Sequence, residues 1–435
     1  MTYMDPGLAA ILCIVFMLFF LILGIPIAFA LGFSATVFGT LAFGPTALYK
    51  MGLATFSLLY NYSWTPLPLF VLMACIITET AIGKDLYKVA RNWVSGLPGA
   101  LVSASILGEA LMASTVGVSG AAIVAVGKVA EPELNRYGYD RKLALGGIMC
   151  GGVLGPLIPP STPLIIYGVI ANVSVGHLLI AGIIPGAILA LMLATVPVLI
   201  CWRNPGLGPA AGSVSWTTKL ASLKKVWPVI AVISAIIGSI FFGIATPTEA
   251  AGIGCVVIII IAVTVFHLRW KGLYQAMVEA TVINAMMLVI IVAASFFSYM
   301  LASAGVGNFL SNLVMSLNIP PKVIVIAIMI LYLVLGSLFD SITITMLTIP
   351  IFAPVLTALG FDLVWFGILY VVNLEIGLIT PPMGVNLFFV RNVFNIKTGD
   401  LLKGAAPYLI SLIIFLCILL FAPGLSLWLP EMMAK

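Results

Sequence analysis

Charged residues are scarce in this sequence. Asp, Glu, Lys and Arg make up 8% of its 435 residues, whereas a soluble globular protein carries about a quarter of such residues. Hydrophobic residues reach 63%, and the mean hydropathy is +1.25. This composition excludes a soluble protein and predicts an all-α chain that crosses a membrane many times. No basic patch lies outside short loops, so nucleic-acid binding is not expected.

Histidine and paired cysteine are nearly absent as well. The two histidines, His177 and His267, lie near predicted span ends, so a catalytic or metal site built on histidine is not expected. None of the six cysteines forms a CxxC pair, and all lie in or beside apolar runs. We interpret them as small core residues rather than disulfides or metal ligands. No Lys or Arg precedes Gly7, so a cleaved signal peptide is not expected.

Long apolar runs, in contrast, are abundant. A membrane-spanning helix needs about 20 apolar residues. We expect spans near residues 8–23, 25–43, 64–81, 143–170, 178–201, 227–244, 250–267, 275–303, 363–390 and 405–425. Two further apolar regions, 98–135 and 323–359, are interrupted near 114–120 and 336–341. Both are predicted to be re-entrant hairpins, which enter the membrane and return on the same side.

The placement of basic residues predicts the orientation. Lys and Arg are enriched in cytoplasmic loops. With the N-terminus in the periplasm and the hairpins counted as no crossing, only Lys50, Lys322 and Lys435 lie outside, and Lys128 falls within the first hairpin. The other basic residues all lie inside. This asymmetry favours both the orientation and the hairpin assignment.

One stretch, residues 151–163, cannot form a continuous helix because its four prolines remove backbone donors. A shift of 222 residues lays GPLIPP at 155–160 on GLITPP at 377–382, and GYD at 138–140 on GFD at 360–362. We interpret this as an internal repeat. Five predicted spans separate the copies, so the second copy is inverted. Inverted repeats with broken helices are typical of secondary transporters.

The repeat predicts a division into scaffold and transport unit. Residues 1–97 and 171–322 are assigned to the scaffold, and 391–435 to a C-terminal helix. Residues 98–170 and 323–390 are assigned to the two halves of the transport unit, each a hairpin followed by a broken helix. Residues 84–99 are predicted to form an amphipathic surface arm, or alternatively an ordinary charged loop.

Each hairpin tip, paired with the neighbouring break, makes a candidate site for sodium. Sodium takes oxygen ligands, and an unwound backbone offers free carbonyls. Side-chain oxygens come from Ser119, Ser161, Thr162, Thr380 and Asn386. The further tip candidates are Gly120, Asp340, Ser341 and Thr343. The alternative is that these Gly- and Pro-rich breaks serve only close packing.

Carboxylates at membrane depth are costly and are functional candidates. Asp340 can either bind a cation directly or hold the second tip through hydrogen bonds. For Glu109 and Glu375, internal pairing or helix packing is expected. Glu249 is predicted to belong to a helix start, with Thr246 as the N-cap and Pro247 at the first helical position.

The whole chain resembles the large membrane subunit of TRAP transporters, the tripartite ATP-independent periplasmic transporters. The stretches that carry this resemblance are GIPIAFAL at 24–31, PLF at 68–70, VSG at 118–120, GYD at 138–140, LGPLIPPS at 154–161, TPTEAA at 246–251, VNL at 372–374, GLITPP at 377–382, GVNLF at 384–388 and LSLWLP at 425–430.

The resemblance implies a permease of the bacterial inner membrane that takes up organic acids with sodium. It also implies a small membrane subunit, a periplasmic substrate-binding protein and an elevator motion of the transport unit. The implied sodium ligands are Ser119, Gly155 and Ser161 in one half, and Gly336, Gly377, Thr380 and Met383 in the other. Ser114, which the shift pairs with Gly336, is a further candidate. No organic cofactor is implied.

The first tip departs from the family pattern. After Ser119 and Gly120 the chain continues Ala121, Ala122, without the second Ser and the later Asp that are common in the family. The substrate stays open among sialic acid, dicarboxylates, keto acids and sulfonates. The alternative functions are a stand-alone sodium–dicarboxylate symporter, a channel, and an intramembrane enzyme, which the lack of a nucleophile–base spacing disfavours.

Overall fold

The computed structural model describes all residues except 1–2, 118, 211, 317–318, 383 and 434–435. In these described residues the chain forms helices and loops without strands. The first half contains α1 (Pro6–Ile22), α2 (Ile27–Phe43), α3 (Thr46–Leu59), η1 (Tyr62–Trp64), α4 (Pro66–Thr78), α5 (Ile82–Val94), α6 (Ala100–Val116), α7 (Ser119–Arg136), α8 (Arg141–Gly151), η2 (Gly152–Leu154), α9 (Thr162–Ile170), α10 (Val175–Ala181) and α11 (Ile183–Arg203).

A linker with η3 (Pro205–Leu207) and the short α12 (Trp216–Leu223) leads to the second half. That half contains α13 (Trp227–Ile233), the π turn η4 (Ser234–Gly238), α14 (Ser239–Phe241), α15 (Pro247–Thr264), α16 (Trp270–Ser303), α17 (Val306–Ser316), α18 (Pro321–Gly336), α19 (Ser341–Ala358), α20 (Leu363–Leu378), α21 (Val385–Phe394), α22 (Thr398–Phe421) and α23 (Gly424–Met433).

The internal repeat extends over nearly the whole chain. Ser119 and Ser341, the first residues of α7 and α19, are 222 residues apart. Other elements begin within two residues of the same offset. The pairs are α1 with α13, α2 with α15, α3–α4 with α16, α5 with α17, α6 with α18, α8 with α20, α9 with α21, and α10–α11 with α22. The repeat therefore includes the scaffold as well as the hairpins.

Matching caps start the two broken helices. Asp140 Oδ1 accepts a hydrogen bond from the Leu143 amide at 2.8 Å, at the start of α8. Asp362 Oδ1 accepts from the amides of Val364 and Trp365 at 2.7 and 3.0 Å, at the start of α20. Such carboxylate caps satisfy amides that have no partner within the helix. The conserved spacing of the GYD and GFD stretches thus marks equivalent helix starts in both halves.

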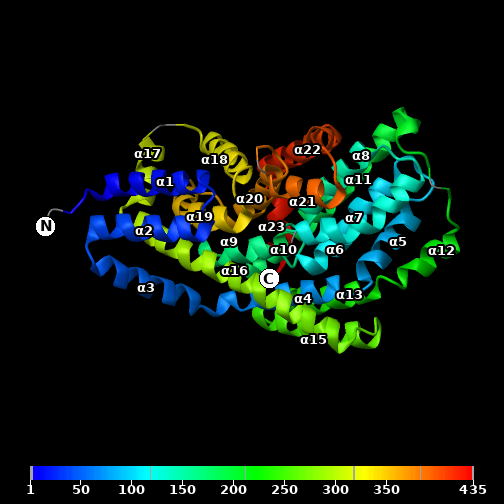
Figure 1. Cartoon of the computed structure of the whole chain (residues 1–435), viewed down its shortest axis with the longest axis horizontal. Coiled ribbons are helices and arrows are strands. Elements are labelled where there is room, and N and C mark those ends of the chain that lie inside the picture. Colours follow the sequence, from blue (N-terminus) through cyan, green and yellow to red (C-terminus); the bar gives the residue numbers. More distant parts are fainter. Residues whose placement is uncertain (1–2, 118, 211, 317–318, 383, 434–435) are drawn as a thin grey trace.

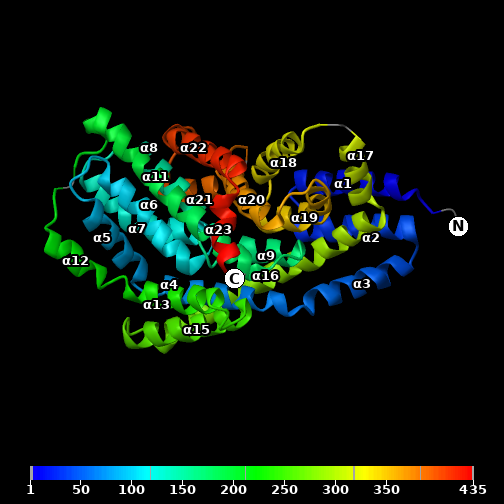
Figure 2. The same cartoon turned by 180° about the vertical axis from the view of Figure 1, so that it is seen from behind.

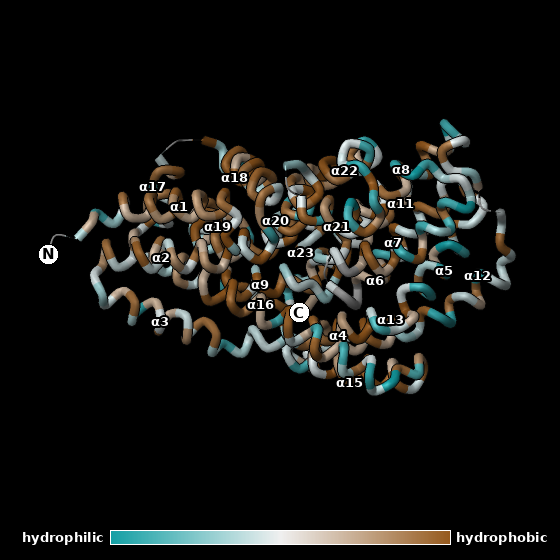
Figure 3. Tube along the Cα trace, viewed as in Figure 1, coloured by the Kyte–Doolittle hydropathy of each residue, from teal (hydrophilic) through white to brown (hydrophobic). Residues whose placement is uncertain are grey.

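The two hairpins, α6–α7 and α18–α19, lie on opposite sides of a centre that contains α9, α20 and α21 (Figures 1 and 2). The long α16 runs beneath this centre and contacts α2, α4 and α19. The predicted interruptions at 114–120 and 336–341 are therefore both confirmed as breaks between paired helices. Figure 3 shows hydrophobic residues along α1, α16 and α18, and hydrophilic residues around α5 and α12.

Helices α8 and α22 pack unusually closely. A Cβ on Gly146 would collide with the backbone of Gly404, and a Cβ on Gly404 would collide with the backbone of Lys142. At the end of this contact, Lys142 Nζ lies 2.9 Å from Asp400 Oδ1. Glycine at both positions lets the two backbones touch, since neither residue carries a side chain.

The amphipathic arm is confirmed as a helix. Residues 84–99 were expected to form the arm, and α5 covers Ile82–Val94. Its inner face buries Ile82, Leu86 and Val89, while Lys84 and Lys88 are exposed. The start of α15 is also confirmed: Thr246 and Glu249 form the reciprocal capping box that the sequence predicts.

Two expectations about the helices were wrong. Residues 46–59 were left outside every span, but they form α3, which continues into η1 and α4 across a bend of 61°. Residues 391–435 were expected to form one C-terminal helix, but they form α22 and α23 and include the end of α21. In the described residues, five helices are long and apolar enough to cross a membrane alone, and two bent pairs qualify together.

Candidate functional site

The first break lies between α8 and α9. After the single turn η2, the chain continues without regular structure to Ser161, and every residue from 151 to 161 except Ile158 is buried. Ser161 Oγ accepts a hydrogen bond from the Leu164 amide at 3.2 Å and donates to the Pro156 carbonyl. The serine therefore caps α9 and fixes the proline-rich segment at the same time.

The first hairpin tip rests directly on this break. The Thr162 amide approaches the Gly117 carbonyl at 3.4 Å. Gly117 has φ +67°, and a Cβ there would collide with the Pro160 carbonyl oxygen. A Cβ on Gly152 would lie 3.4 Å from the Ser119 carbonyl oxygen. The contact is made by backbone on backbone, which places several carbonyl groups close together.

The second tip meets the second break through a pair of glycines. A Cβ on Gly336 would lie 3.0 Å from the Gly377 Cα, and one on Gly377 would lie 2.7 Å from the Gly336 Cα. The Gly384 amide donates to the Ser337 carbonyl at 3.1 Å. Thr380 Oγ1 donates to the Ile376 carbonyl at 2.6 Å. Gly336, Gly377 and Thr380, three predicted ligands, therefore belong to one contact region.

A side-chain link joins the two halves. Ser119 Oγ, at the start of α7, donates to Asn386 Oδ1 on α21 at 3.1 Å. Asn386 Nδ2 donates in turn to Glu375 Oε2 on α20 at 3.2 Å. All three side chains are buried. Gly120 lies beside them, since its Cβ would be 3.2 Å from the Phe389 ring. The internal pairing expected for Glu375 is present.

Asp340 forms a cap at the second tip. Its Oδ2 accepts from the amides of Ile342 and Thr343 at 3.0 and 3.1 Å, and its Oδ1 accepts from Thr343 Oγ1 at 2.6 Å. Of the two roles predicted for this carboxylate, the structure contains the hydrogen-bonded tip. Ser341 contributes its backbone carbonyl to Thr345 Oγ1 at 2.6 Å.

Two predicted ligands cannot be placed. Met383 and the side chain of Ser114 lie outside the described residues. Gly155 lies in the first break, where its amide donates to the Gly152 carbonyl at 3.0 Å. In the described part of the chain no group of His, Cys, Asp and Glu could hold a metal ion. The oxygens available near the tips are therefore mainly carbonyls and hydroxyls.

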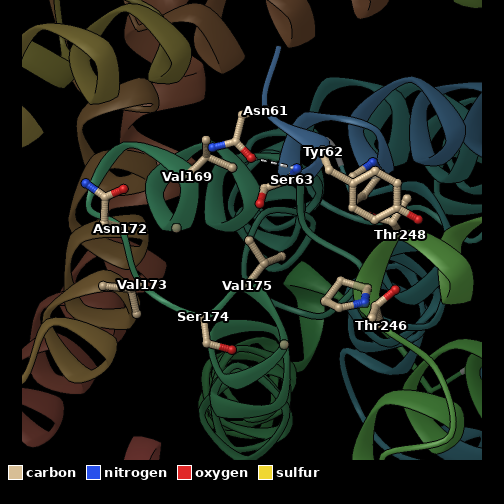
Figure 4. A pocket seen from close by; sticks show the side chains of 14 residues that line it. Asn61, Tyr62, Ser63, Val169, Asn172, Val173, Ser174, Val175, Thr246 and Thr248 are labelled. Atoms are coloured by element: carbon tan, nitrogen blue, oxygen red, sulfur yellow. Dashed lines mark hydrogen bonds between the residues drawn. The ribbon is translucent and has the colours of Figure 1, made fainter. Parts of the chain in front are cut away.

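A polar cavity that the sequence did not predict lies at the far end of α9. It has a volume of about 430 Å³ and is lined by η1, the α9–α10 turn and the start of α15. Figure 4 shows Asn61, Ser63, Asn172, Ser174 and Thr246 around it. It contains none of the tip residues. Only the common side of these loops in the orientation prediction could have indicated it.

Broken helices that meet re-entrant tips in an inverted repeat define a secondary transporter. A family model described as "Tripartite ATP-independent periplasmic transporter, DctM component" matches residues 14–425. The chain belongs to this family and is a transporter permease, not an enzyme.

Two full-length relatives have printed functions. The chain is 33% identical to the C4-dicarboxylate TRAP transporter large permease protein DctM of Pseudomonas aeruginosa, over 90% of this chain and 91% of that one. It is 30% identical to the sialic acid TRAP transporter large permease protein SiaM of Vibrio cholerae, over 94% and 95%. The isethionate TRAP transporter permease protein DctMQ of Oleidesulfovibrio alaskensis is 28% identical, over 94% of this chain and 64% of that one.

The fold also occurs in solved structures of distant transporters. The YdaH transporter of Alcanivorax borkumensis superimposes with a TM-score of 0.66 at 16% identity, over 97% of this chain and 98% of that one. MtrF of Neisseria gonorrhoeae superimposes with a TM-score of 0.57 at 14% identity, over 96% and 95%. At such identities the likeness concerns the fold alone.

Proposed function

We propose that this permease drives the uptake of a small organic acid anion across the bacterial inner membrane with a sodium gradient. A periplasmic binding protein delivers the substrate, and a small membrane subunit supports the scaffold. The N-terminus lies in the periplasm. The observation that carries the proposal is the link from Ser119 to Asn386, because it makes one centre out of both tips and both breaks.

Sodium binds where the tips rest on the breaks. The Gly117–Pro160 contact and the Gly336–Gly377 contact each bring unwound or terminal backbone together in a buried region. Carbonyl groups of this kind suit a hard cation. Ser119, Ser161 and Thr380 add hydroxyl oxygens. Bound sodium would hold each tip on its break and so join hairpin and broken helix into one body.

The anion binds between the tips, nearer to the first. Helix N-termini attract anions, and α7, α9 and α21 all begin in this centre. The N-terminus of α19 is already occupied by the Asp340 carboxylate. A substrate carboxylate or sulfonate is therefore repelled from the second tip and meets free amides at the first. Motion of the tips and breaks against α2, α4, α15 and α16 then carries the site across the membrane.

The test is uptake into proteoliposomes that hold this chain with its small membrane partner. A C4-dicarboxylate, sialic acid and isethionate would be offered separately, since relatives are named for these compounds. Each would be measured with and without a cognate binding protein and an inward sodium gradient. We expect uptake of one anion that needs both. Uptake that needs sodium alone would instead indicate a stand-alone symporter, and flux linear in substrate would indicate a channel.

A further inference from the structure

Glu109 is a buried acid that the proposed sodium and substrate sites do not use. It lies in the middle of α6 with an exposed fraction of 0%. Neither of its carboxyl oxygens has a hydrogen-bond partner among the described residues. Glu375 is buried to a similar extent, but it accepts a hydrogen bond from Asn386. Glu109 is therefore the acid whose presence the packing does not explain.

The carboxyl fits into a space left by a glycine. Glu109 Oε2 occupies the position that a Cβ on Gly151 would take. Gly151 is the last residue of α8, directly before the first break. The C-terminal end of a helix carries partial negative charge, so it disfavours a carboxylate beside it.

No basic group compensates a charge on Glu109. The titratable group that faces it from the helices packed on α6 is the Cys150 thiol of α8. On α5 and α7, Arg91 and Glu133 pair with each other at 2.9 Å, and Lys84 and Lys88 are exposed. Helices α4 and α13 contain no charged residue, and α11 has only Arg203 at its end.

A permanent charge in this position would cost several kcal/mol. The neutral acid avoids that cost, but its O–H group then lacks an acceptor in the arrangement described here. A leucine or methionine would satisfy the space at lower cost. The side chain is thus a poor choice for packing alone.

The internal repeat provides a comparison for this contact. The 222-residue shift places Leu331 of α18 opposite Glu109, and Asn373 of α20 opposite Gly151. In the second half, Asn373 Nδ2 donates to the Met329 carbonyl on α18 at 2.7 Å. A hairpin helix and a broken helix are thus joined by a satisfied polar contact there. In the first half the equivalent polar group can lose and gain a proton.

We propose that Glu109 is a proton-binding site, so that a proton is bound and released during the transport cycle. The carboxylate takes a proton from water and becomes the neutral acid in the packed arrangement described here. When water reaches the contact between α6 and α8, the proton returns to the aqueous phase. High pH therefore favours the opened contact. The binding of the proton stands on the Glu109 environment, and its place in a cycle rests on the proposed function.

The first experiment measures protonation without transport. Infrared difference spectra of the purified chain would be recorded between neutral and high pH, for the wild type and for Glu109→Gln. We expect a protonated-carboxyl band in the wild type that Glu109→Gln removes. Glu131→Gln serves as the matched control, because Glu131 is partly exposed and pairs with Arg141 at 3.1 Å. A band that Glu109→Gln leaves unchanged would overturn the proposal.

The second experiment measures proton movement during uptake. Proteoliposomes with a pH-sensitive dye inside would be driven by a fixed sodium gradient. We expect substrate uptake by the wild type to change the internal pH, and Glu109→Gln to abolish that change while Glu131→Gln keeps it. An equal pH change in Glu109→Gln would overturn the coupling. If no uptake occurs at all, the proposed function fails, while the infrared result still decides proton binding.

Should Glu109→Gln fail to fold, Glu109→Asp replaces it in the infrared experiment. The shorter side chain keeps the acid but moves the carboxyl away from Gly151. We expect the carboxyl band to shift in frequency and to titrate at lower pH, since the group then lies outside the glycine space. An unshifted band would assign it to another residue and reject Glu109 as its source.

Discussion

The first and second hairpin tips occupy equivalent places in the repeat, yet they make their contacts with different groups. At the first tip, Gly117 and Thr162 meet through backbone atoms, and the first break is almost entirely buried. At the second tip, a carboxylate caps α19, and Pro381 and Pro382 in the second break are exposed. The difference indicates that the backbone contacts preserve the architecture, whereas the side chains adapt each tip to its own task.

The largest effect is expected at the first tip. Gly117→Ala places a methyl group against the Pro160 carbonyl in a backbone conformation that favours glycine. We expect at least a tenfold loss of uptake and a lower melting temperature in detergent. The control is Gly138→Ala, because Gly138 also has positive φ, at +70°, but no atom lies within 4 Å of its Cβ position. Equal losses in both variants would show that strain alone, and not the tip contact, is responsible.

The link between the halves is expected to give the next largest effect. Asn386→Ala removes the acceptor of Ser119 and leaves the buried Glu375 carboxyl without its donor. Loss of a buried partner costs about 1–3 kcal/mol. Ser119→Ala removes only the hydroxyl and should cost less. A double-mutant cycle on uptake and thermal stability measures the coupling, and additive losses would mean that the two tips act independently.

Substitution of Asp340 separates its cap from its charge. Asp340→Asn keeps an N-cap side chain, whereas Asp340→Ala loses about 1 kcal/mol of helix stabilisation. We expect Asp340→Ala to lower thermal stability and Asp340→Asn to leave it close to that of the wild type. The sodium dependence of uptake is the second measurement. If both variants weaken it equally, the carboxylate acts on the cation as well as on the tip.

The smallest of these effects is expected at Thr380. Thr380→Val keeps the shape but removes the hydroxyl that now donates to Ile376. If this oxygen is a sodium ligand, its loss should cost about 1 kcal/mol, equivalent to roughly a fivefold higher sodium concentration for half-maximal uptake. The matched control is Thr357→Val, whose hydroxyl also donates to its own helix, at the Ala353 carbonyl, but is exposed. Unchanged sodium dependence in Thr380→Val would remove this residue from the second site.

Much of the architecture could be predicted from the sequence because the repeat leaves clear marks. Prolines at 156, 159, 160 and 163 interrupt an apolar run, and the same pattern returns 222 residues later. Helix starts at Asp140, Thr246 and Asp362 follow directly from capping chemistry. Both interruptions inside the hairpins were placed correctly for the same reason.

Other features depend on contacts that one sequence does not reveal. Helix α3 was missed because Asn61 and Ser63 interrupt the apolar run before α4, and the sequence does not show that α3 and α4 together match the continuous α16. The hydrogen bond from Ser119 to Asn386 joins residues 267 positions apart and conforms to no spacing rule. The exposed polar cavity near Asn61 likewise forms from three separate loops.

The glycine contact between α8 and α22 has a consequence for the size of the moving body. Backbones that touch at Gly146 and Gly404 leave no clearance for lipid tails or for sliding. If the first broken helix rises and falls in the bilayer, the C-terminal helix is obliged to travel with it. The chain end beyond α22 would then shift against α2, so a pair of spin labels on these two helices would record the stroke as a change in their separation.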